Sequence, residues 1–376
     1  MGVTDVLPPP PKRRRRPPMA VLRAGSKFSA SVLPVLPEIV QRGLTGFRPL
    51  VVDGNILDPT LQLFTASLRA SGVPGLVLDE HNLADSRQAM LDLCVALGGP
   101  PAPVAVSGVT VPGRLEGQPD IAARHYAPNT EARNVDGPAP LVVFFHGGGY
   151  VLGGLDTYDA LCRLISHDAG VHVLSVDYRL APEHKAPAAA DDAWAAYLWA
   201  VEHALALGAD PARIAVAGDS AGGALAAVVA QRARDEGAPL PALQVLLYPW
   251  VDLTAPSRSR TLFADGLVLT QRDLDFCGHA YVGGSGVEVT DPRVSPARAS
   301  DLSGLPPALV VTAGFDPLRD EGERYAQSLA AAGVGCDLRS MGSLVHGFVN
   351  FKAFGGACER AIDEVTLALR AHLRRA

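Results

Sequence analysis

The sequence predicts an α/β fold in which a mostly parallel central sheet is covered by helices on both faces. From about residue 104 onward, short apolar runs alternate with helical stretches, and this alternation is typical of such a sheet. The run 141–145, LVVFF, is apolar without polar alternation, which suits a strand buried on both faces. With 376 residues, 48% hydrophobic and 19% charged, the chain can bury one large core.

Residues 1–29 are predicted to form a disordered tail. Their segment PPPPKRRRRPP, residues 8–18, is rich in proline, which does not initiate a helix, and it carries five cationic side chains. A twin-arginine export signal needs an apolar stretch next, but Arg23 and Lys27 interrupt it, so export is not expected. The basic run allows a weak contact with an anionic membrane. In an alternative interpretation Met19 is the true start, and the tail does not exist.

Residues 30–100 have a helical, amphipathic pattern. In LDPTLQLFTASLRASG, Asp58 is placed to cap a helix, Pro59 stands in its first turn, and Gly72 ends it. A second helix is predicted in ADSRQAMLDLCVALGG. The apolar stripes of the two helices consist of Leu61, Phe64 and Leu68 in the first and Ala89, Leu93 and Leu97 in the second.

Further strands are predicted in VHVLSVDY, RIAVAG, LQVLLYPW, ALVVTAG and VGCDLRS. Helical stretches such as DDAWAAYLWAVEHALALG separate them. In a sheet of this kind the functional residues lie at the carboxyl ends of the strands. No apolar run approaches the length of a membrane span.

The strand LVVFF runs directly into His146 and three consecutive glycines, Gly147 to Gly149. Glycines let the backbone come close to a ligand, and exposed backbone N–H groups usually meet an anion, either a phosphate or a reaction oxyanion. A P-loop would need GxxxxGK[ST], and a dinucleotide loop would need a glycine where Leu152 stands. The pattern therefore favours an oxyanion over a phosphate.

An oxyanion site requires a nucleophile, and GDSAGG, residues 218–223, supplies a candidate. Ser220 is the centre of a GxSxG pattern that follows the strand RIAVAG and opens the helix ALAAVVAQRARDEG. This context predicts a tight, strained turn that holds the hydroxyl above the sheet edge. A serine is a poor nucleophile at neutral pH, so a histidine base and an orienting carboxylate are also expected.

His346, in SLVHGF, is the predicted base, because it follows a strand and precedes the C-terminal helix. Asp316, just past the strand ALVVTAG, is the predicted orienting acid, with Asp320 in reserve. Asp320 and Glu321 are interpreted as first-turn residues of the next helix. His146 is expected to make a structural hydrogen bond. The order Ser, Asp, His is the order that α/β-hydrolases use.

Five ordered motifs carry a family resemblance: HGGGY, DYRLAPEH, GDSAGG, GFDPLRDEG and HGF. Together they resemble the hormone-sensitive-lipase branch of the α/β-hydrolases, over roughly residues 105–370. The segment VVDGNILDPTLQLF also resembles the cap region of actinobacterial lipases and esterases in that branch. Lys185 and Ala186 depart from the usual residues after PEH, outside the predicted triad.

The resemblance implies an oxyanion hole made by the backbone N–H groups of Gly148, Gly149 and Ala221. It also implies that residues 30–100, with a helical insertion near residues 255–285, form a cap over the acyl pocket. Residues 101–376 would then be the α/β-hydrolase catalytic domain. Members of the branch often dimerise, so a homodimer is allowed. Tyr150 and Trp250 are either pocket-lining or core residues, and DYRLAPEH is expected to brace the loop.

The predicted function is that of a serine carboxylic-ester hydrolase, an esterase or lipase, which acts through an acyl-enzyme on short to medium acyl esters. Its expected partner is a small-molecule ester, and neither a metal nor an organic cofactor is required. One alternative applies the same chemistry in an amidase, an arylacetamide-type deacetylase or a long-chain lipase. Another is a small-molecule receptor on this scaffold, in which the catalytic histidine is replaced, whereas His346 is present here.

The amino-acid composition argues against other classes of protein and indicates a cellular compartment. A net charge of −6 and a pI near 5.9 give no electrostatic basis for binding nucleic acid. The five cysteines are scattered and never spaced as CxxC, which argues against a disulfide framework and a thiolate zinc site. A reducing, cytoplasmic location is therefore expected.

Overall fold

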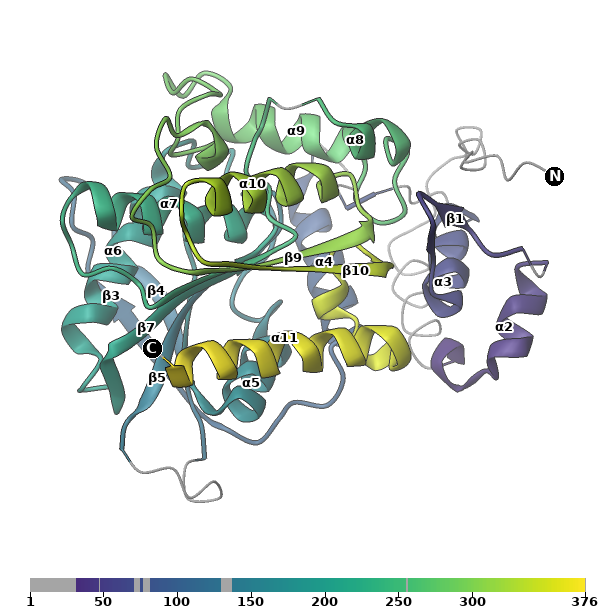
Figure 1. Ribbon diagram of the computed structural model, residues 1–376, viewed down its shortest axis with the longest axis horizontal. Coiled ribbons are helices and arrows are strands. Elements are labelled where there is room, and N and C mark those ends of the chain that lie inside the picture. The colour runs from purple at the N-terminus through teal and green to yellow at the C-terminus, as the bar shows by residue number, and fades with distance from the viewer. Residues whose placement is uncertain are drawn as a thin grey trace.

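The computed structural model describes residues 32–46, 48–70, 75–76, 82–129, 137–254 and 256–375. The predicted tail, residues 1–29, lies outside the described residues. Within these ranges, eight strands form the main sheet in the order β10-β9-β8-β7-β5-β6-β4-β3. Figure 1 shows helices on both faces of this sheet. The predicted α/β fold class is confirmed.

The parallel part of the sheet contains the runs expected to be strands. It comprises β5 (Ala139–Phe145), β6 (His172–Val176), β7 (Ala209–Asp219), β8 (Leu243–Leu247), β9 (Ala308–Phe315) and β10 (Cys336–Val345). Strands β3 (Ala105–Val111) and β4 (Ile121–Ala127) complete one edge in antiparallel pairing. Most of β3 is exposed, which is why its sequence lacks the apolar run of a central strand.

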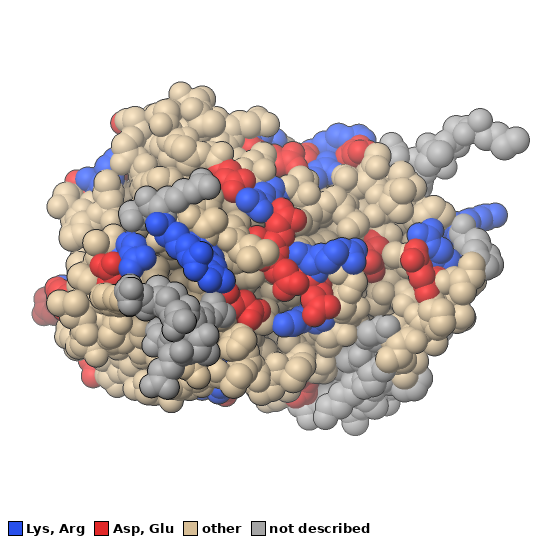
Figure 2. Space-filling view, turned by 60° about the horizontal axis from the view of Figure 1, so that its bottom comes forward, with Lys and Arg blue, Asp and Glu red and all other residues tan. Residues whose placement is uncertain are grey.

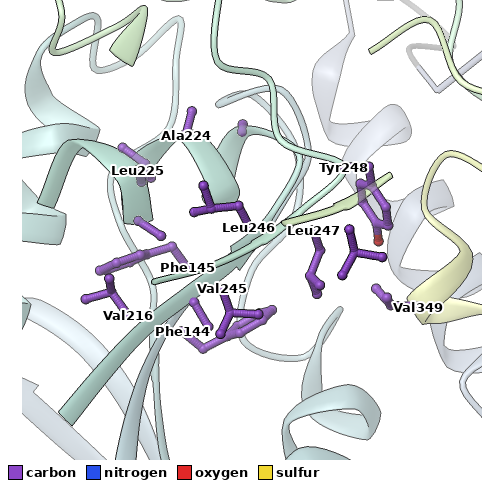
Figure 3. Packing of buried hydrophobic residues seen from close by; sticks show 14 of the residues in the cluster. Phe144, Phe145, Val216, Ala224, Leu225, Val245, Leu246, Leu247, Tyr248 and Val349 are labelled. Atoms are coloured by element: carbon purple, nitrogen blue, oxygen red, sulfur yellow. The ribbon is translucent and has the colours of Figure 1, made fainter. Parts of the chain in front are cut away.

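Helices cover the sheet in two layers. One face carries α6 (Ala188–His203), α7 (Ala221–Asp235) and α10 (Arg319–Ala331), and the other carries α5 (Asp159–Ile165) and α11 (Gly356–Arg375), as Figure 1 shows. A turn of π-helix, Ser166–Gly170, extends α5. Figure 3 shows the apolar packing between the sheet and α7. Successive strand residues point to opposite faces, so Phe144 and Phe145 of β5 belong to different layers of this core.

The N-terminal segment is built from short elements. They are η1 (Leu33–Val35), α2 (Glu38–Leu44), the hairpin β1 (Val51–Val52) and β2 (Asn55–Ile56), α3 (Pro59–Ala70) and α4 (Leu83–Leu97). Asp58 caps α3 as expected, because its Oδ1 accepts the N–H of Thr60 at 2.9 Å. The predicted end at Gly72 lies outside the described residues. The most buried residues of α4 are Ser86, Met90, Cys94 and Leu97, with Ala89 and Leu93 only half-buried beside them.

Two helices, α8 (Arg258–Leu262) and α9 (Gln271–Val282), lie between β8 and β9 in the region predicted as an insertion. Helix α9 begins with a capping box, in which Thr270 and Asp273 each bond the other's backbone N–H. Three short 3₁₀ turns complete the chain, at Pro296–Arg298, Phe348–Asn350 and Lys352–Phe354.

The face that carries α11 mixes acidic and basic side chains without a continuous area of one sign, as Figure 2 shows. One such pair on this helix joins Glu364 to Arg339 of β10 at 3.1 Å. In the part of the chain that the structure describes, none of the helices has the length and apolar character needed to cross a membrane.

Candidate active site

Ser220 lies at a sharp turn between β7 and α7, at the carboxyl end of a central strand. Its backbone angles, φ 55° and ψ −120°, fall in a region that L-residues rarely occupy. The turn requires glycine at position 222, because a Cβ there would overlap the carbonyl oxygen of Phe145. The backbone of Ser220 is held on both sides: its N–H donates to Leu247 at 2.8 Å, and its carbonyl accepts from Trp250 at 3.0 Å.

The structure brings Ser220, His346 and Asp316 together from three different strand ends. The Nε2 atom of His346 lies 3.0 Å from the Oγ atom of Ser220. The Nδ1 atom of the same ring lies 2.8 Å from an oxygen of Asp316. The remaining oxygen of Asp316 accepts the backbone N–H of Leu318 at 2.8 Å. The ring is thus held at both nitrogens between a hydroxyl and a carboxylate.

All three side chains are buried, with Asp316 fully enclosed. The ring of Tyr248 packs against His346 with 4.7 Å between centroids. Asp320, the reserve candidate for the acid, is engaged elsewhere: it accepts the N–H of Ser259 at 2.8 Å and pairs with Arg319 at 2.9 Å. The geometry favours Asp316 over Asp320 as the partner of His346.

Three backbone N–H groups were predicted as oxyanion donors, two in the glycine loop and one directly after Ser220. Gly148 and Gly149 both have positive φ angles, 117° and 63°, and a side chain on Gly149 would collide with Cys277. Ala221 is the first residue of α7, where backbone N–H groups have no partner within the helix. Among the described residues, none of the three N–H groups donates a hydrogen bond. These are the N–H groups that the family resemblance implies as the oxyanion hole.

His146 shapes the loop rather than facing Ser220. Its Nδ1 bonds the carbonyl of Gly147 at 2.7 Å, and its ring stacks on Tyr178 with 4.2 Å between centroids. Burial lowers the pKa of this imidazole to about 4. The ring is accordingly neutral at physiological pH, with the proton on Nδ1.

Asp219 precedes Ser220 and is nearly inaccessible to solvent. One of its oxygens accepts the hydroxyl protons of Tyr158 at 2.9 Å and Tyr248 at 3.3 Å. Burial raises the pKa of the carboxyl to about 6, and the hydroxyl donors partly oppose that shift. These contacts give Asp219 a hydrogen-bonding role in the turn around Ser220.

Arg87 of α4 reaches the glycine loop, and no motif pointed to it. Its guanidinium donates to the carbonyls of Val151 at 2.9 Å and Ala181 at 3.1 Å, and it forms two bonds of 2.8 Å with Glu183. Ala181 and Glu183 belong to the segment DYRLAPEH, residues 177–184. Arg87 therefore ties the N-terminal segment to both loops that border the site. Because Arg87 and Glu183 are 96 positions apart, no local sequence pattern indicates this contact.

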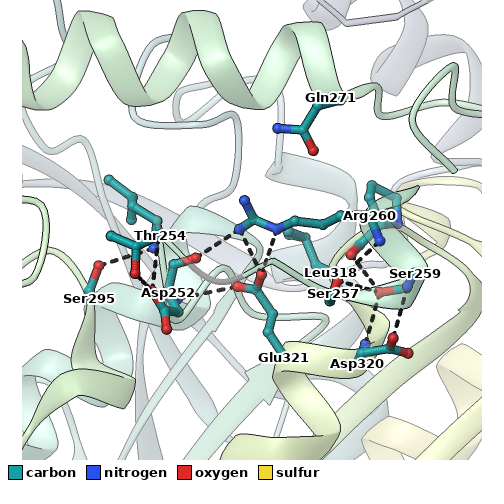
Figure 4. Close-up of polar contacts among 12 residues, drawn as sticks. Asp252, Thr254, Ser257, Ser259, Arg260, Gln271, Ser295, Leu318, Asp320 and Glu321 are labelled. Atoms are coloured by element: carbon teal, nitrogen blue, oxygen red, sulfur yellow. Dashed lines mark hydrogen bonds and ion pairs between the residues drawn. The ribbon is translucent and has the colours of Figure 1, made fainter. Parts of the chain in front are cut away.

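A buried ion pair under α8 was also missed. Glu321, interpreted as a first-turn residue of α10, is indeed in that turn, but it is buried and pairs with Arg260 at 2.7 Å (Figure 4). Burial raises the pKa of Glu321 to about 7, with Arg260 opposing the shift. The same arginine donates to the backbone carbonyl of Asp252 at 2.7 Å. The pair fixes α8 and the chain after β8 to α10.

A cavity of about 400 Å³ lies between the chain after β8 and helix α9. Its lining includes Trp250, Leu253, Leu274, Gly278, Val282 and Val289, together with Arg260, Asp275, His279 and Glu288. Trp250 borders both the cavity and the glycine loop, because a Cβ on Gly149 would stand 4.0 Å from its ring. Tyr150 is instead a core residue, stacked on Tyr281 with 4.0 Å between centroids.

No group of three or more His, Cys, Asp or Glu side chains within the described ranges is arranged to hold a metal ion. The polar atoms around Ser220 are hydroxyl, imidazole, carboxylate and backbone N–H groups. This donor set suits proton transfer and stabilisation of negative charge.

Comparisons with known proteins identify the family of this chain. A family model described as alpha/beta hydrolase fold matches residues 142–350. The carboxylic ester hydrolase LipN of Mycobacterium tuberculosis is 52% identical to this chain, covering 92% of it and 90% of that protein. An ethyl acetate hydrolase of Pseudomonas putida is 36% identical, covering 84% and 99%. The structure of an esterase from the archaeon Pyrobaculum calidifontis has a TM-score of 0.74 at 38% identity, covering 84% and 98%.

The fold and these matches define an α/β-hydrolase. The chain belongs to this family, and its relatives support the hormone-sensitive-lipase-like branch that the motifs predicted. Because the relatives are named as ester hydrolases and esterases, they also support the predicted class of enzyme, a carboxylesterase-type hydrolase.

Proposed function

We propose that this protein is a serine carboxylic-ester hydrolase with Ser220 as nucleophile, His346 as base and Asp316 as orienting acid. One observation carries the proposal: a continuous chain of hydrogen bonds from the hydroxyl, through both imidazole nitrogens, to the carboxylate, with steps of 3.0 Å and 2.8 Å. In this arrangement the carboxylate keeps the proton on Nδ1, so Nε2 is free to accept the hydroxyl proton.

The reaction has two halves. Ser220 Oγ attacks the ester carbonyl as His346 takes its proton, and the tetrahedral intermediate collapses when the imidazolium protonates the departing alcohol. Water then attacks the acyl-enzyme, with His346 again as base, and the carboxylic acid leaves as Ser220 regains its proton. The N–H groups of Gly148, Gly149 and Ala221 would bind both oxyanions. Loss of one such donor typically costs about 3 kcal/mol of transition-state stabilisation.

We assign the acyl group to the cavity behind Trp250. Its volume of about 400 Å³ is near the lower end of the range of about 300–1,000 Å³ for small-molecule sites. That size favours short to medium acyl chains. Residues 30–100 and the insertion near 255–285 would act as the cap, because α4 contacts the glycine loop through Arg87 and α9 lines the cavity.

The test is hydrolysis of a p-nitrophenyl ester series from acetate to palmitate by the wild type and by Ser220→Ala. Turnover by the wild type alone, with an optimum at short to medium chains, is the expected result. Equal rates for both proteins would overturn the role of Ser220. A matching p-nitroanilide series separates the esterase from the amidase alternative.

A second variant tests the cavity. A Cβ on Gly278 would stand 3.7 Å from the Trp250 ring, which is ordinary contact, so Gly278→Val should fit while filling the cavity. The chain-length optimum is expected to move to shorter esters. Gly335→Val is the matched control, because that glycine is exposed and has open space around it. An unchanged optimum in Gly278→Val would place the acyl chain elsewhere.

A further inference from the structure

The hairpin formed by β1 and β2 has a tight turn that its sequence specifies. The two central residues, Asp53 and Gly54, have φ angles of 52° and 79°. A two-residue hairpin turn of type I′ requires positive φ at both central positions, and Asp-Gly is one of the pairs it prefers. Figure 1 shows β1 beyond the ends of β9 and β10, the strands that lead to Asp316 and His346. The hairpin therefore presents the Asp53 carboxylate near that end of the sheet.

The carboxylate of Asp53 bonds two arginines that lie far along the chain. Its Oδ1 accepts Nη2 of Arg258 at 2.6 Å, and its Oδ2 accepts Nη2 of Arg319 at 2.8 Å. The bond from Arg258 and the charge and bond of Arg319 hold the pKa of this carboxyl below its ordinary value, although partial burial opposes them. Asp53 is accordingly ionised at physiological pH.

Arg319, at the start of α10, connects Asp53 to the turn that carries Asp316. Its Nη1 donates to the carbonyl of Gly314 in β9 at 3.1 Å, and its backbone N–H donates to the carbonyl of Asp316 at 3.1 Å. The arginine is buried, with 8% exposed, and a buried guanidinium is costly unless carboxylates pair with it. Asp320 pairs with its Nε at 2.9 Å, and Asp53 holds Nη2. One side chain thus spans the turn, and Asp53 fixes its outer end.

The same hairpin contacts the strand that leads to His346. The register between β10 and β9 shifts within residues 341–345, immediately before His346. In this irregular stretch the carbonyl of Ser343 accepts the backbone N–H of Asp58, just after β2, at 3.0 Å. Irregularities of this kind beside active sites set the direction of a neighbouring side chain. The chain after β2 therefore supports the segment from which His346 projects.

We infer that the β1–β2 hairpin is a positioning element for the acid and the base of the proposed reaction, with Asp53 acting on Asp316 through Arg319. The inference rests on the proposed function, since it concerns two of its three residues. It is distinct from the role of a cap, because neither Asp53 nor Arg319 is among the residues that line the cavity behind Trp250. A cap residue acts on the acyl group, whereas a positioning residue acts on the rate of the chemical step.

The test is Asp53→Asn, assayed with the p-nitrophenyl ester series. Asparagine tolerates positive φ and is also preferred in this turn, but it is neutral and offers one acceptor oxygen to two arginines. We expect kcat to fall about fivefold, with KM and the chain-length optimum unchanged. Asp210→Asn is the matched control, because Asp210 pairs with Arg213 at 2.7 Å at the start of β7, the strand end opposite Ser220. It should keep the wild-type kcat.

A double-mutant cycle separates positioning from a general loss of folded protein. In a protein that already carries Asp316→Asn, Asp53→Asn should lower kcat by less than about twofold, because the group it positions is gone. An unchanged kcat in Asp53→Asn would overturn the inference, and so would a loss of equal size in both backgrounds or a change confined to KM. Ser220→Ala keeps the two proposals apart. If it abolishes turnover while Asp53→Asn has the wild-type kcat, hydrolysis by Ser220 stands and the positioning role fails; if it retains turnover, the proposed nucleophile is wrong.

Discussion

The carboxylate of Asp219 accepts the backbone N–H of Gly147 at 2.7 Å. This bond joins the residue before the candidate nucleophile to the first glycine of the loop that contains the predicted donors Gly148 and Gly149. The two halves of the site, Ser220 and the glycine loop, are thereby fixed relative to one another by one buried side chain. Burial raises the pKa of Asp219 to about 6, and the nearby His346 partly opposes this shift.

Asp219→Asn is expected to lower kcat about tenfold, which corresponds to about 1.4 kcal/mol of lost stabilisation of the imidazolium. The free energy of unfolding should respond differently to this substitution. The pKa of Asp219 is raised to about 6 in the folded state, so its stabilising contribution is present below about pH 4 and lost as pH rises through 6. Urea unfolding at pH 8 should therefore show no large loss of stability in the variant. An unchanged kcat would contradict the role assigned to the carboxylate.

Asp316→Asn is expected to lower kcat by roughly 10³–10⁴-fold, because the amide no longer holds His346 in the tautomer that accepts a proton. Asp320→Asn, four residues along the chain and engaged with Ser259 and Arg319, should change kcat by no more than a few fold. Steady-state rates with a soluble ester decide between them. A larger loss in Asp320→Asn would reverse the assignment of the acid.

Arg87→Ala should lower kcat about tenfold or more with little change in KM, because the glycine loop loses a support that matters mainly in the transition state. Arg87→Lys should recover only part of the rate, since an ammonium cannot reach two carbonyls and a carboxylate in one plane. Arg114→Ala is the matched control: that arginine pairs with Glu202 at 2.5 Å on the surface. A rise in KM alone would show that Arg87 acts on substrate binding.

His125 of β4 and His172 of β6 form a stacked, hydrogen-bonded pair, with 3.0 Å between ring nitrogens. Burial lowers the pKa of His125, and burial together with His125 lowers that of His172 to about 4. The unfolded chain therefore takes up protons below about pH 6.5 that the folded chain does not, and stability falls as pH drops toward 4.

Replacing His172 by glutamine should make unfolding less sensitive to acid. Between pH 7.5 and pH 5 the wild type is expected to lose about 2 kcal/mol more stability than His172→Gln, measured by urea unfolding. The exposed His184→Gln provides the comparison and should track the wild type at both pH values. Parallel losses in wild type and His172→Gln would mean that the pair does not control acid stability.

The sequence predicted the sheet well because its central strands are buried on both faces and read as continuous apolar runs. Ser220, Asp316 and His346 could be predicted to lie together for a related reason: each directly follows a strand, and the carboxyl ends of parallel strands meet at one edge. Strand β3, which is mostly exposed, carried no such signal.

The residues that escaped prediction act through distant contacts. Arg87 meets its partners 64 and 96 positions away, and Arg260 meets Glu321 across 61 positions. Neither contact is indicated by a local sequence pattern, because the sequence around an arginine on a helix surface does not show whether its side chain faces solvent or a carbonyl. Glu321 is an example: the sequence predicted its position in the first turn of α10 but did not predict its burial.

The ion pair between Arg87 and Glu183 has a consequence for the design of chimeric proteins. Cap segments are natural parts to exchange between related hydrolases when a different chain length is wanted. Here the guanidinium that contacts the glycine loop is encoded in α4, and its carboxylate partner is encoded after that loop, at residue 183. A crossover placed after α4 would take residue 87 from the other parent protein and leave Glu183 without its arginine partner. A crossover placed before residue 82 keeps them in one parent.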